Sequence, residues 1–467
     1  MGEYWYAPPG REVVNDYYFQ KPERLPQYIT EAVLRRRAAQ LPNVQTYFGW
    51  TVGQVEQDDH SVRVTMAPTS EDSSPFYSWA ADTQQVTRQD IAGREGLQVL
   101  EADYVVGCDG ARSLVREQLG IDRGGADFDQ RMVLAVLRSR ELHEATKRFP
   151  EATTYRVLKP ELQGYWQFFG RIDVGEGFFF HAPVPRDTRK DNYDFLGLIR
   201  EAAGFEVRAE LDHVGFWDLR IAVARRYRIG RAMIAGDACH SHPPYGGFGL
   251  NSGLEDARNI GWKLAAVISG WGGEKLLESY TEERRPIFDE TGEAMIAGGI
   301  EQDRQFLTRY NPNTDRAEFE HAWQEISTGA RRRQQTYEPH YEGSSIVFGP
   351  SGAVCSIHGG YTFQAQAGHH LAPQTLSSGR NVFEEIGSDF SLLAFGVDAQ
   401  AARQFEDAAQ QLHIPLEVIV DSLDGSRERY GSRLILVRPD HHVVWTGDTP
   451  PSDVRAILRR VTGTADT

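Results

Sequence analysis

The residues best suited to chemistry lie in one stretch, GDACHSHPPYGGFGLNSG, from Gly236 to Gly253. The apolar run at 232–235 before it predicts a short buried strand, and Gly236 lets the chain leave that strand sharply. Asp237 is then expected at the carboxyl end of the strand, where ligands bind in α/β sheets. A carboxylate in that place suits the hydroxyl groups of a polyol chain.

A glycine loop and a predicted helix follow Asp237. The three glycines between 246 and 249 let the backbone approach the face of a flat ligand closely. Ser252 and Glu255 have the spacing of a capping box and predict a helix over 252–269, which Gly270 would end. The N-terminus of that helix would direct N–H groups and a partial positive charge at a ligand on the glycines. The predicted buried stripe of the helix is Leu254, Ile260, Leu264 and Val267.

A second candidate turn lies earlier, in DYVVGCDGARS from Asp103 to Ser113. Its β-branched centre predicts a strand that feeds a tight turn at 107–110, and a helix is expected over 112–119. Asp109 would end the strand and Arg112 would open the helix, so both are expected at one ligand-facing rim. An Asp-Gly turn with a capped helix and no ligand is the alternative.

Both segments resemble signature sequences of the single-component flavin monooxygenases of the para-hydroxybenzoate hydroxylase type. The similarity is greatest to the subgroup with a C-terminal thioredoxin-like domain, which includes phenol, hydroxyphenylpropionate and polyketide hydroxylases. The resemblance implies that Asp237 binds ribityl hydroxyls, that 247–251 line the isoalloxazine ring, and that Asp109 serves the pyrophosphate and nicotinamide-nucleotide region. The FAD-binding residues expected on this basis are Gly236, Asp237, Pro244, Gly246, Gly247, Gly249, Leu250, Asn251, Asp109, Gly110, Arg112 and Gln27.

The resemblance implies a reaction and leaves two alternatives. An enzyme of this family would use FAD, NADPH or NADH, and O2 to hydroxylate a small aromatic substrate, such as a phenolic or polyketide ring. A Baeyer–Villiger oxygenase of the same fold is the first alternative. The second is a truncated, flavin-free relative that acts as a binding module. It is considered because residues 1–26 lack the GxGxxG pattern, and the apolar strand before it, with which the family's βαβ unit opens.

The predicted fold class is α/β, with an incomplete Rossmann-like FAD-binding domain, an antiparallel β-sheet substrate domain and a thioredoxin-like α/β domain. The partial FAD-binding domain, without its N-terminal βαβ unit, is expected at 1–130 and the substrate domain at 131–222. The second part of the FAD-binding domain, with long helices, is expected at 223–342. The thioredoxin-like domain is expected at 353–467; it has no CxxC, which excludes dithiol chemistry and leaves packing or homodimerisation as its role.

The sheet at 131–222 is rich in aromatic residues and is expected to hold the substrate. A sheet core is the alternative interpretation for most of these residues. No residue is assigned as the base that activates the substrate, so the catalytic residues are unknown. The candidate walls are Tyr165, Trp166, Phe168, Phe178 and Trp217.

Composition narrows the function classes. The net charge of −16 argues against nucleic acid as a partner, because a phosphate-binding face needs excess Lys and Arg. Three scattered cysteines without CxxC spacing fit a reducing compartment. No apolar run is long enough to cross a bilayer and the N-terminus does not read as a signal peptide, so a cytoplasmic enzyme without membrane contact is expected. The paired histidines at 240/242, 369/370 and 441/442 lack a Cys or acidic partner, so no metal site is expected.

Overall fold

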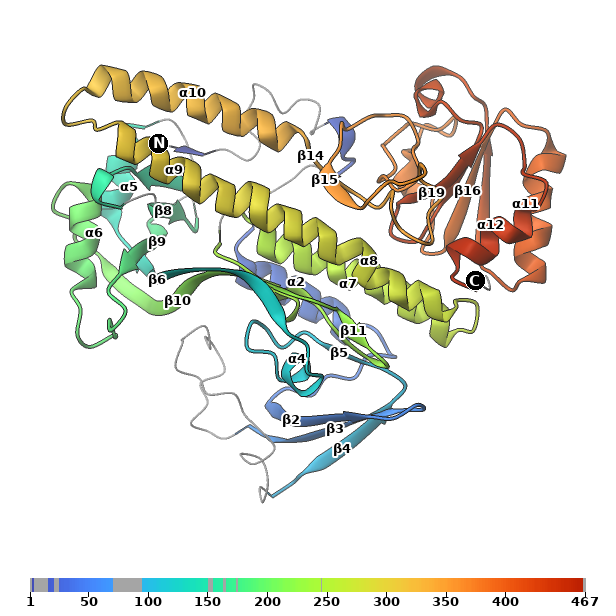
Figure 1. Cartoon of the computed structure of the whole chain (residues 1–467), viewed down its shortest axis with the longest axis horizontal. Helices are drawn as coiled ribbons and strands as arrows, with labels where there is room; N and C mark the ends of the chain where they lie inside the picture. The colour runs from blue at the N-terminus through green and yellow to red at the C-terminus, as the bar shows by residue number, and fades with distance from the viewer. Residues whose placement is uncertain are drawn as a thin grey trace.

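Long helices cross the centre of the molecule, with a seven-stranded sheet at one end and the C-terminal domain at the other (Figure 1). Among the residues that the structure describes, no helix is long and apolar enough to span a membrane. The computed structural model describes residues 2–3, 16–20, 25–69, 95–149, 154–162, 165–173, 175–244 and 246–464.

Two small sheets form the part of the molecule that carries the predicted ligand edge. Strands β2, β3 and β4 pair antiparallel in that order, and a second sheet has the order β11–β12–β5. β12 and β5 are parallel, so the strands predicted before Asp237 and Asp109 are neighbours. The elements are α2 (Gln27–Ala39), β2 (Trp50–Gln57), β3 (Val62–Pro68), β4 (Gln98–Ala102), β5 (Val105–Gly107), α4 (Leu114–Gln118), β11 (Arg228–Ile229) and β12 (Ala232–Ile234).

The seven-stranded sheet is antiparallel throughout, as predicted for the substrate domain. Its strand order is β1–β7–β8–β9–β6–β10–β13, and β6 and β10 are its longest strands. The strands are β1 (Gly2–Glu3), β6 (Arg123–Arg138), β7 (Thr154–Val157), β8 (Gln167–Arg171), β9 (Gly177–Val184), β10 (Glu210–Ala224) and β13 (His240–Ser241). Two helices belong to this part, α5 (Arg140–Thr146) and α6 (Phe195–Ala203).

The two faces of this sheet differ because side chains alternate along each strand. On one face, Val133 and Phe180 join a core with residues of α5 and α6, among them Ile199, which is 0% exposed. The opposite face carries His181 and Trp217, and aromatic rings surround them. The sheet therefore has one structural face and one aromatic face.

Four helices and a short π-helical segment follow the sheet. α8 continues without a break through the π segment η3 into α9, a departure from regular helix that is frequent near functional sites. The elements are η2 (Gly236–Ala238), α7 (Phe248–Ile268), α8 (Glu274–Glu290), η3 (Thr291–Ala297), α9 (Gly298–Arg309) and α10 (Arg316–Gln335).

Helix α7 differs from its prediction in both its start and its buried face. It begins at Phe248, with Gly247 in the left-handed conformation as N-cap, so the predicted capping box of Ser252 and Glu255 lies inside the helix and no side chain caps it. Leu254, predicted to be buried, is 42% exposed, whereas Ile260 is buried as predicted. Half of the buried residues of α7 are polar, namely Ser252, Asp256, Asn259 and Lys263.

The C-terminal domain is a mixed sheet in the order β17–β16–β18–β19, with two helices packed against it. Trp262 of α7 belongs to the same apolar core, so this domain packs directly on the central helices. Two short strands, β14 (Tyr337–His340) and β15 (Ser356–His358), precede it. Its elements are β16 (Phe390–Phe395), α11 (Ala399–Gln411), β17 (Leu416–Asp421), β18 (Leu434–Val437), β19 (Val443–Gly447) and α12 (Val454–Val461).

Gly125 should be indispensable to the pairing of β6 with β10. Its φ is +140°, and a Cβ built on it would lie 1.9 Å from the carbonyl oxygen of Ile221. Gly125→Ala should therefore destabilise the protein by more than ~2 kcal/mol, through backbone strain and overpacking. The neighbouring Gly124 has open space, so Gly124→Ala is the matched control. Urea unfolding monitored by circular dichroism checks this, and equal midpoints for the two variants would contradict it.

Candidate active site

The two turns predicted from the sequence meet at one sheet edge. β5 and β12 are parallel, with Gly107 opposite Ile234, so the segments that follow them leave the sheet side by side. The Ala235 N–H donates to the Gly107 carbonyl at 3.0 Å. Arg116 then ties the turns together, because its guanidinium donates to the carbonyl of Ala238 at 3.0 Å and to that of Ala111 at 3.1 Å.

Asp237 presents its carboxylate at this edge. Gly236, at φ +61°, makes the sharp exit from β12 that the sequence predicted, and Asp237 follows in the short helix η2. Its side chain is exposed, yet the protein around it raises the pKa of the carboxyl by desolvation, and nearby His240 opposes that rise. A carboxylate that is accessible but only partly solvated is well placed to accept hydrogen bonds from ligand hydroxyls.

The glycine loop opens the N-terminus of α7 to a ligand. Gly246 and Gly247 both have positive φ, +67° and +74°, and the N-cap residue Gly247 has no side chain that could cap the N–H groups of the first turn. The Nε2 atom of His242, on the same loop, is buried and has no hydrogen-bond partner among the residues that the structure describes. Free donors, an unsatisfied ring nitrogen and open backbone fit a flat ligand with an anionic edge, as the isoalloxazine of FAD has when reduced. The predicted Pro244, Leu250 and Asn251 are all exposed beside this loop.

The other predicted cofactor residues are placed less directly. Asp109 accepts a hydrogen bond from the Val115 N–H at 3.0 Å and so supports the start of α4, as the alternative interpretation of this turn proposed. Gly110, at φ +79°, and the exposed Arg112 lie on the same turn. Gln27 is the exposed first residue of α2. Contact of Asp109, Arg112 and Gln27 with a cofactor stays a prediction.

A buried carboxylate that the sequence analysis did not single out holds this edge in shape. Asp256 of α7 accepts hydrogen bonds from the Gly236 N–H at 3.0 Å, from His240 at 2.6 Å and from Arg284 of α8 at 2.8 Å. Burial would raise the pKa of Asp256, but His240 and Arg284 lower it to about 2. Asp256 therefore stays ionised and fixes the turn that carries Asp237.

One residue before Arg284, a second buried carboxylate joins the C-terminal domain to the helices. Glu283 accepts from Lys263 of α7 at 2.7 Å and from both Nη atoms of Arg438, at 2.7 and 2.8 Å. Arg438 also donates to Asp440 at 2.6 Å, and all four side chains are buried. Burial and Arg438 lower the pKa of Lys263, Glu283 opposes them, and the result is about 8. We call Lys263, Glu283, Arg438 and Asp440 the Glu283 network.

The aromatic face of the sheet reaches the start of α7. Trp217 donates to His181 at 3.3 Å, and Phe168 stacks on the same imidazole with ring centroids 4.9 Å apart. Tyr165 and Trp217 pack against a cluster that contains Phe248, the first residue of α7. The predicted walls Tyr165, Trp166, Phe168 and Trp217 thus gather on one side, whereas Phe178 is 0% exposed in the core on the other face.

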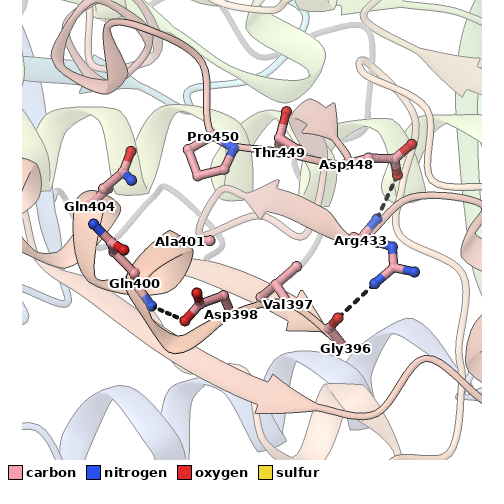
Figure 2. Close-up of a pocket in the computed structure, with 10 residues that line it drawn as sticks. All are labelled: Gly396, Val397, Asp398, Gln400, Ala401, Gln404, Arg433, Asp448, Thr449 and Pro450. Carbon is pink, nitrogen blue, oxygen red and sulfur yellow. Dashed lines mark hydrogen bonds between the residues drawn. The ribbon is translucent and has the colours of Figure 1, made fainter.

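A surface hollow of about 480 Å³ lies elsewhere, in the C-terminal domain (Figure 2). It is formed around the start of α11, where Asp398 accepts from the Gln400 N–H at 3.0 Å, and around Arg433, whose N–H donates to Asp448. Its lining contains no cysteine, in agreement with the absence of CxxC from the sequence. Nothing in this lining connects it with the edge at Asp237.

Matches to known protein families, together with the fold, identify the chain as an FAD-dependent monooxygenase. Residues 1–294 match the FAD binding domain family, and residues 365–465 match the family of the aromatic-ring hydroxylase C-terminal domain. The chain therefore belongs to the FAD binding domain family, and the resemblance found in the sequence is confirmed.

Relatives and solved structures agree with this assignment. The chain is 28% identical to the FAD-dependent monooxygenase opdD of Penicillium oxalicum, over 93% of this chain and 84% of the relative. It is 30% identical to the tetracenomycin A2 monooxygenase-dioxygenase of Streptomyces glaucescens, over 82% and 69%. The rebeccamycin biosynthetic enzyme RebC with reduced flavin superposes with a TM-score of 0.70 at 27% identity, over 89% and 74% of the two chains.

Arg438→Ala should weaken FAD binding although Arg438 lies in the C-terminal domain. The substitution leaves buried Glu283 with one cation fewer, and breaking a buried pair in this way costs about 3–5 kcal/mol. Loosened helices α7 and α8 would then hold the Asp237 turn less firmly. Isothermal titration of the flavin-free protein with FAD, together with thermal unfolding, measures both effects.

The matched control is Arg427→Ala. Arg427 is a buried arginine of the same domain, but its partners Asp421, Ser422 and Thr375 all lie within that domain. This variant should lose stability and keep its affinity for FAD. Equal FAD affinities for the Arg427 and Arg438 variants would show that the Glu283 network does not act on the flavin edge.

Proposed function

We propose that this chain hydroxylates a polycyclic phenolic or polyketide aromatic ring, with FAD as cofactor, NADPH or NADH as reductant and O2 as the oxygen source. The observation that carries the proposal is the junction of the two parts of the site. Phe248 begins α7 at the end of the glycine loop, and it packs in the cluster that Tyr165 and Trp217 of the aromatic face also join. A flat aromatic substrate on this face would lie beside a flavin held by the loop.

The residues present have separate tasks in this reaction. FAD, when bound, supplies the electron transfer and the activation of O2. Asp237 would hold the ribityl hydroxyls, and the uncapped first turn of α7 would stabilise negative charge on the pyrimidine edge of the flavin. The aromatic face would exclude water and orient the substrate ring through stacking. One relative is named a tetracenomycin A2 monooxygenase-dioxygenase and another a putative polyketide hydroxylase, and these names support a polyketide aromatic substrate.

The proposal also includes the location, the oligomeric state and the alternative reaction that the sequence predicted. A cytoplasmic location agrees with the three free cysteines, and a homodimer through the C-terminal domain stays a prediction. Baeyer–Villiger insertion stays the enzymatic alternative, since it would use the same flavin edge.

The proposed reaction can be tested with purified protein, FAD and a panel of polycyclic phenols. We expect substrate-stimulated oxidation of NADPH or NADH and incorporation of one atom of ¹⁸O2 into the product. Because hydroxylation and Baeyer–Villiger insertion both add one oxygen atom, NMR of the product must distinguish a new ring hydroxyl from a lactone or ester. An insertion product, or no substrate-dependent oxidation with a flavin-loaded enzyme, would contradict the proposal.

Asp237→Ala tests the flavin edge separately from turnover. Loss of hydrogen bonds to a charged group of this kind corresponds to about 1.5–3 kcal/mol, so FAD should bind about 10- to 100-fold more weakly. Asp448→Ala, an exposed aspartate in the hollow of Figure 2, is the matched control and should bind FAD normally. Titration of intrinsic fluorescence with FAD gives both constants, and an unchanged constant for Asp237→Ala would remove this carboxylate from the site.

A further inference from the structure

Two histidines and a glutamate from two segments of the chain converge where β14 meets the C-terminal domain. His340 ends β14, Glu342 lies two residues further on, and His369 comes from the loop that leads to the C-terminal sheet. One ligand atom from each side chain lies within 4.8 Å of those of the other two, and His369 Nε2 is 3.1 Å from Glu342 Oε1. We propose that His340, Glu342 and His369 bind a divalent transition-metal cation of the zinc type.

The donor set matches the chemistry of such a cation. Imidazole nitrogens and a carboxylate are usual zinc ligands, and bonds of about 2.0–2.2 Å require donor atoms roughly 3.3 Å apart in a tetrahedral site. The contact between His369 and Glu342 already has that spacing. Two protein histidines and one glutamate leave a fourth position for water, as in known His₂Glu sites.

His340 supplies an observation that independently points to a ligand. The residue is 6% exposed, and its Nδ1 is buried without a hydrogen-bond partner among the described residues. A buried polar atom that lacks a hydrogen-bond partner destabilises the fold. Its other nitrogen makes only a 3.3 Å contact with the His358 carbonyl. A bound cation would satisfy the ring.

A second carboxylate orients His369 in the way typical of metal-binding histidines. Glu338 Oε1 pairs with His369 Nδ1 at 3.0 Å, which leaves Nε2 directed at Glu342. Glu338 is itself fixed by hydrogen bonds from the Tyr17 hydroxyl, at 3.0 Å, and from the Tyr361 N–H. Such outer carboxylates raise the basicity of a ligating imidazole and hold its orientation.

Binding of a cation would change both the charge balance of this cluster and the orientation of the His340 ring. The carboxylates of Glu338 and Glu342 both contact the imidazole of His369, and one proton on that ring balances only one of them. A divalent cation balances both. The rings of His340 and His369 stack with centroids 4.7 Å apart and planes 11° apart, whereas a shared cation must lie in the plane of each ring. The His340 ring therefore tilts out of the stack on binding, with loss of its weak contact to His358.

A cation bound here would also stabilise the start of α7, next to the glycine loop. Tyr337, three residues before His340 on β14, lies 5.0 Å from the ring of Phe248 and 3.2 Å from the hydroxyl of Thr291. Tying β14 to the C-terminal loop would thus hold the support beneath the start of α7. The proposal does not depend on the identity of the substrate.

The test is a titration of the EDTA-stripped full-length protein with ZnCl₂ by calorimetry, with the bound metal measured after desalting. We expect one Zn²⁺ per chain and a raised thermal midpoint. Glu342→Gln and His340→Gln should abolish binding or weaken it by more than the about 10- to 100-fold that loss of an outer-shell partner causes. The exposed His358 in the adjacent strand provides the matched control, His358→Gln, which should bind as the unmodified protein does.

Glu342 is partly exposed, so its replacement by glutamine should leave the fold intact, and far-UV circular dichroism verifies this. Zn²⁺ binding that is lost in Glu342→Gln and kept in His358→Gln establishes the site. Absence of stoichiometric binding to the unmodified protein would overturn the proposal, and so would equal affinity in all variants. His369 would then be an ion-paired histidine between two glutamates and no more.

Discussion

The buried pairing of Glu283 with Lys263 and Arg438 is the interaction on which the rest of the structure depends. It joins α7, α8 and the C-terminal domain at a point from which water is excluded. The next residue along α8, Arg284, bonds to Asp256, and Asp256 bonds to the backbone beneath Asp237. The carboxylate proposed to hold the ribityl chain is therefore positioned by a chain of buried charges that begins in the C-terminal domain.

These buried ion pairs explain why α7 buries charged and polar side chains beside its apolar ones. A helix normally buries its apolar stripe, yet α7 buries Asp256, Asn259 and Lys263 and exposes Leu250 and Leu254. Burial of charge is unfavourable unless each charge is paired. Here every carboxylate has at least one cation within hydrogen-bond distance, so the polar stripe is accommodated. The C-terminal domain, without a dithiol of its own, contributes Arg438 to this balance.

The ligand edge and the aromatic face belong to different sheets, and they meet at Phe248. The parallel pair β5–β12 places two turns side by side, whereas the antiparallel sheet presents aromatic rings on one face only. A flavin requires the two adjacent turns, and an aromatic substrate requires the face that carries aromatic rings. Tyr337 of β14 contacts Phe248, the residue at which the two parts meet, and so links the histidine cluster at the end of β14 to the start of α7.

The sequence by itself determined the features that depend on local spacing. The turn at Gly236 and Asp237, the glycine loop, the stop at Gly270 and the antiparallel sheet were all predictable, because a glycine or a period of two acts on its own segment. The predicted start of α7 was wrong because Gly247, in the left-handed conformation, caps the helix earlier than the predicted capping box at Ser252 would. Only the tertiary structure decided which face of α7 is buried. Lys263 of α7 is buried against Glu283, and Arg438, the other cation bound to Glu283, lies 155 residues from that glutamate in the sequence. The same holds for the approach of His369 to His340 and Glu342, because His369 lies 27 residues beyond Glu342 and only the fold brings them together.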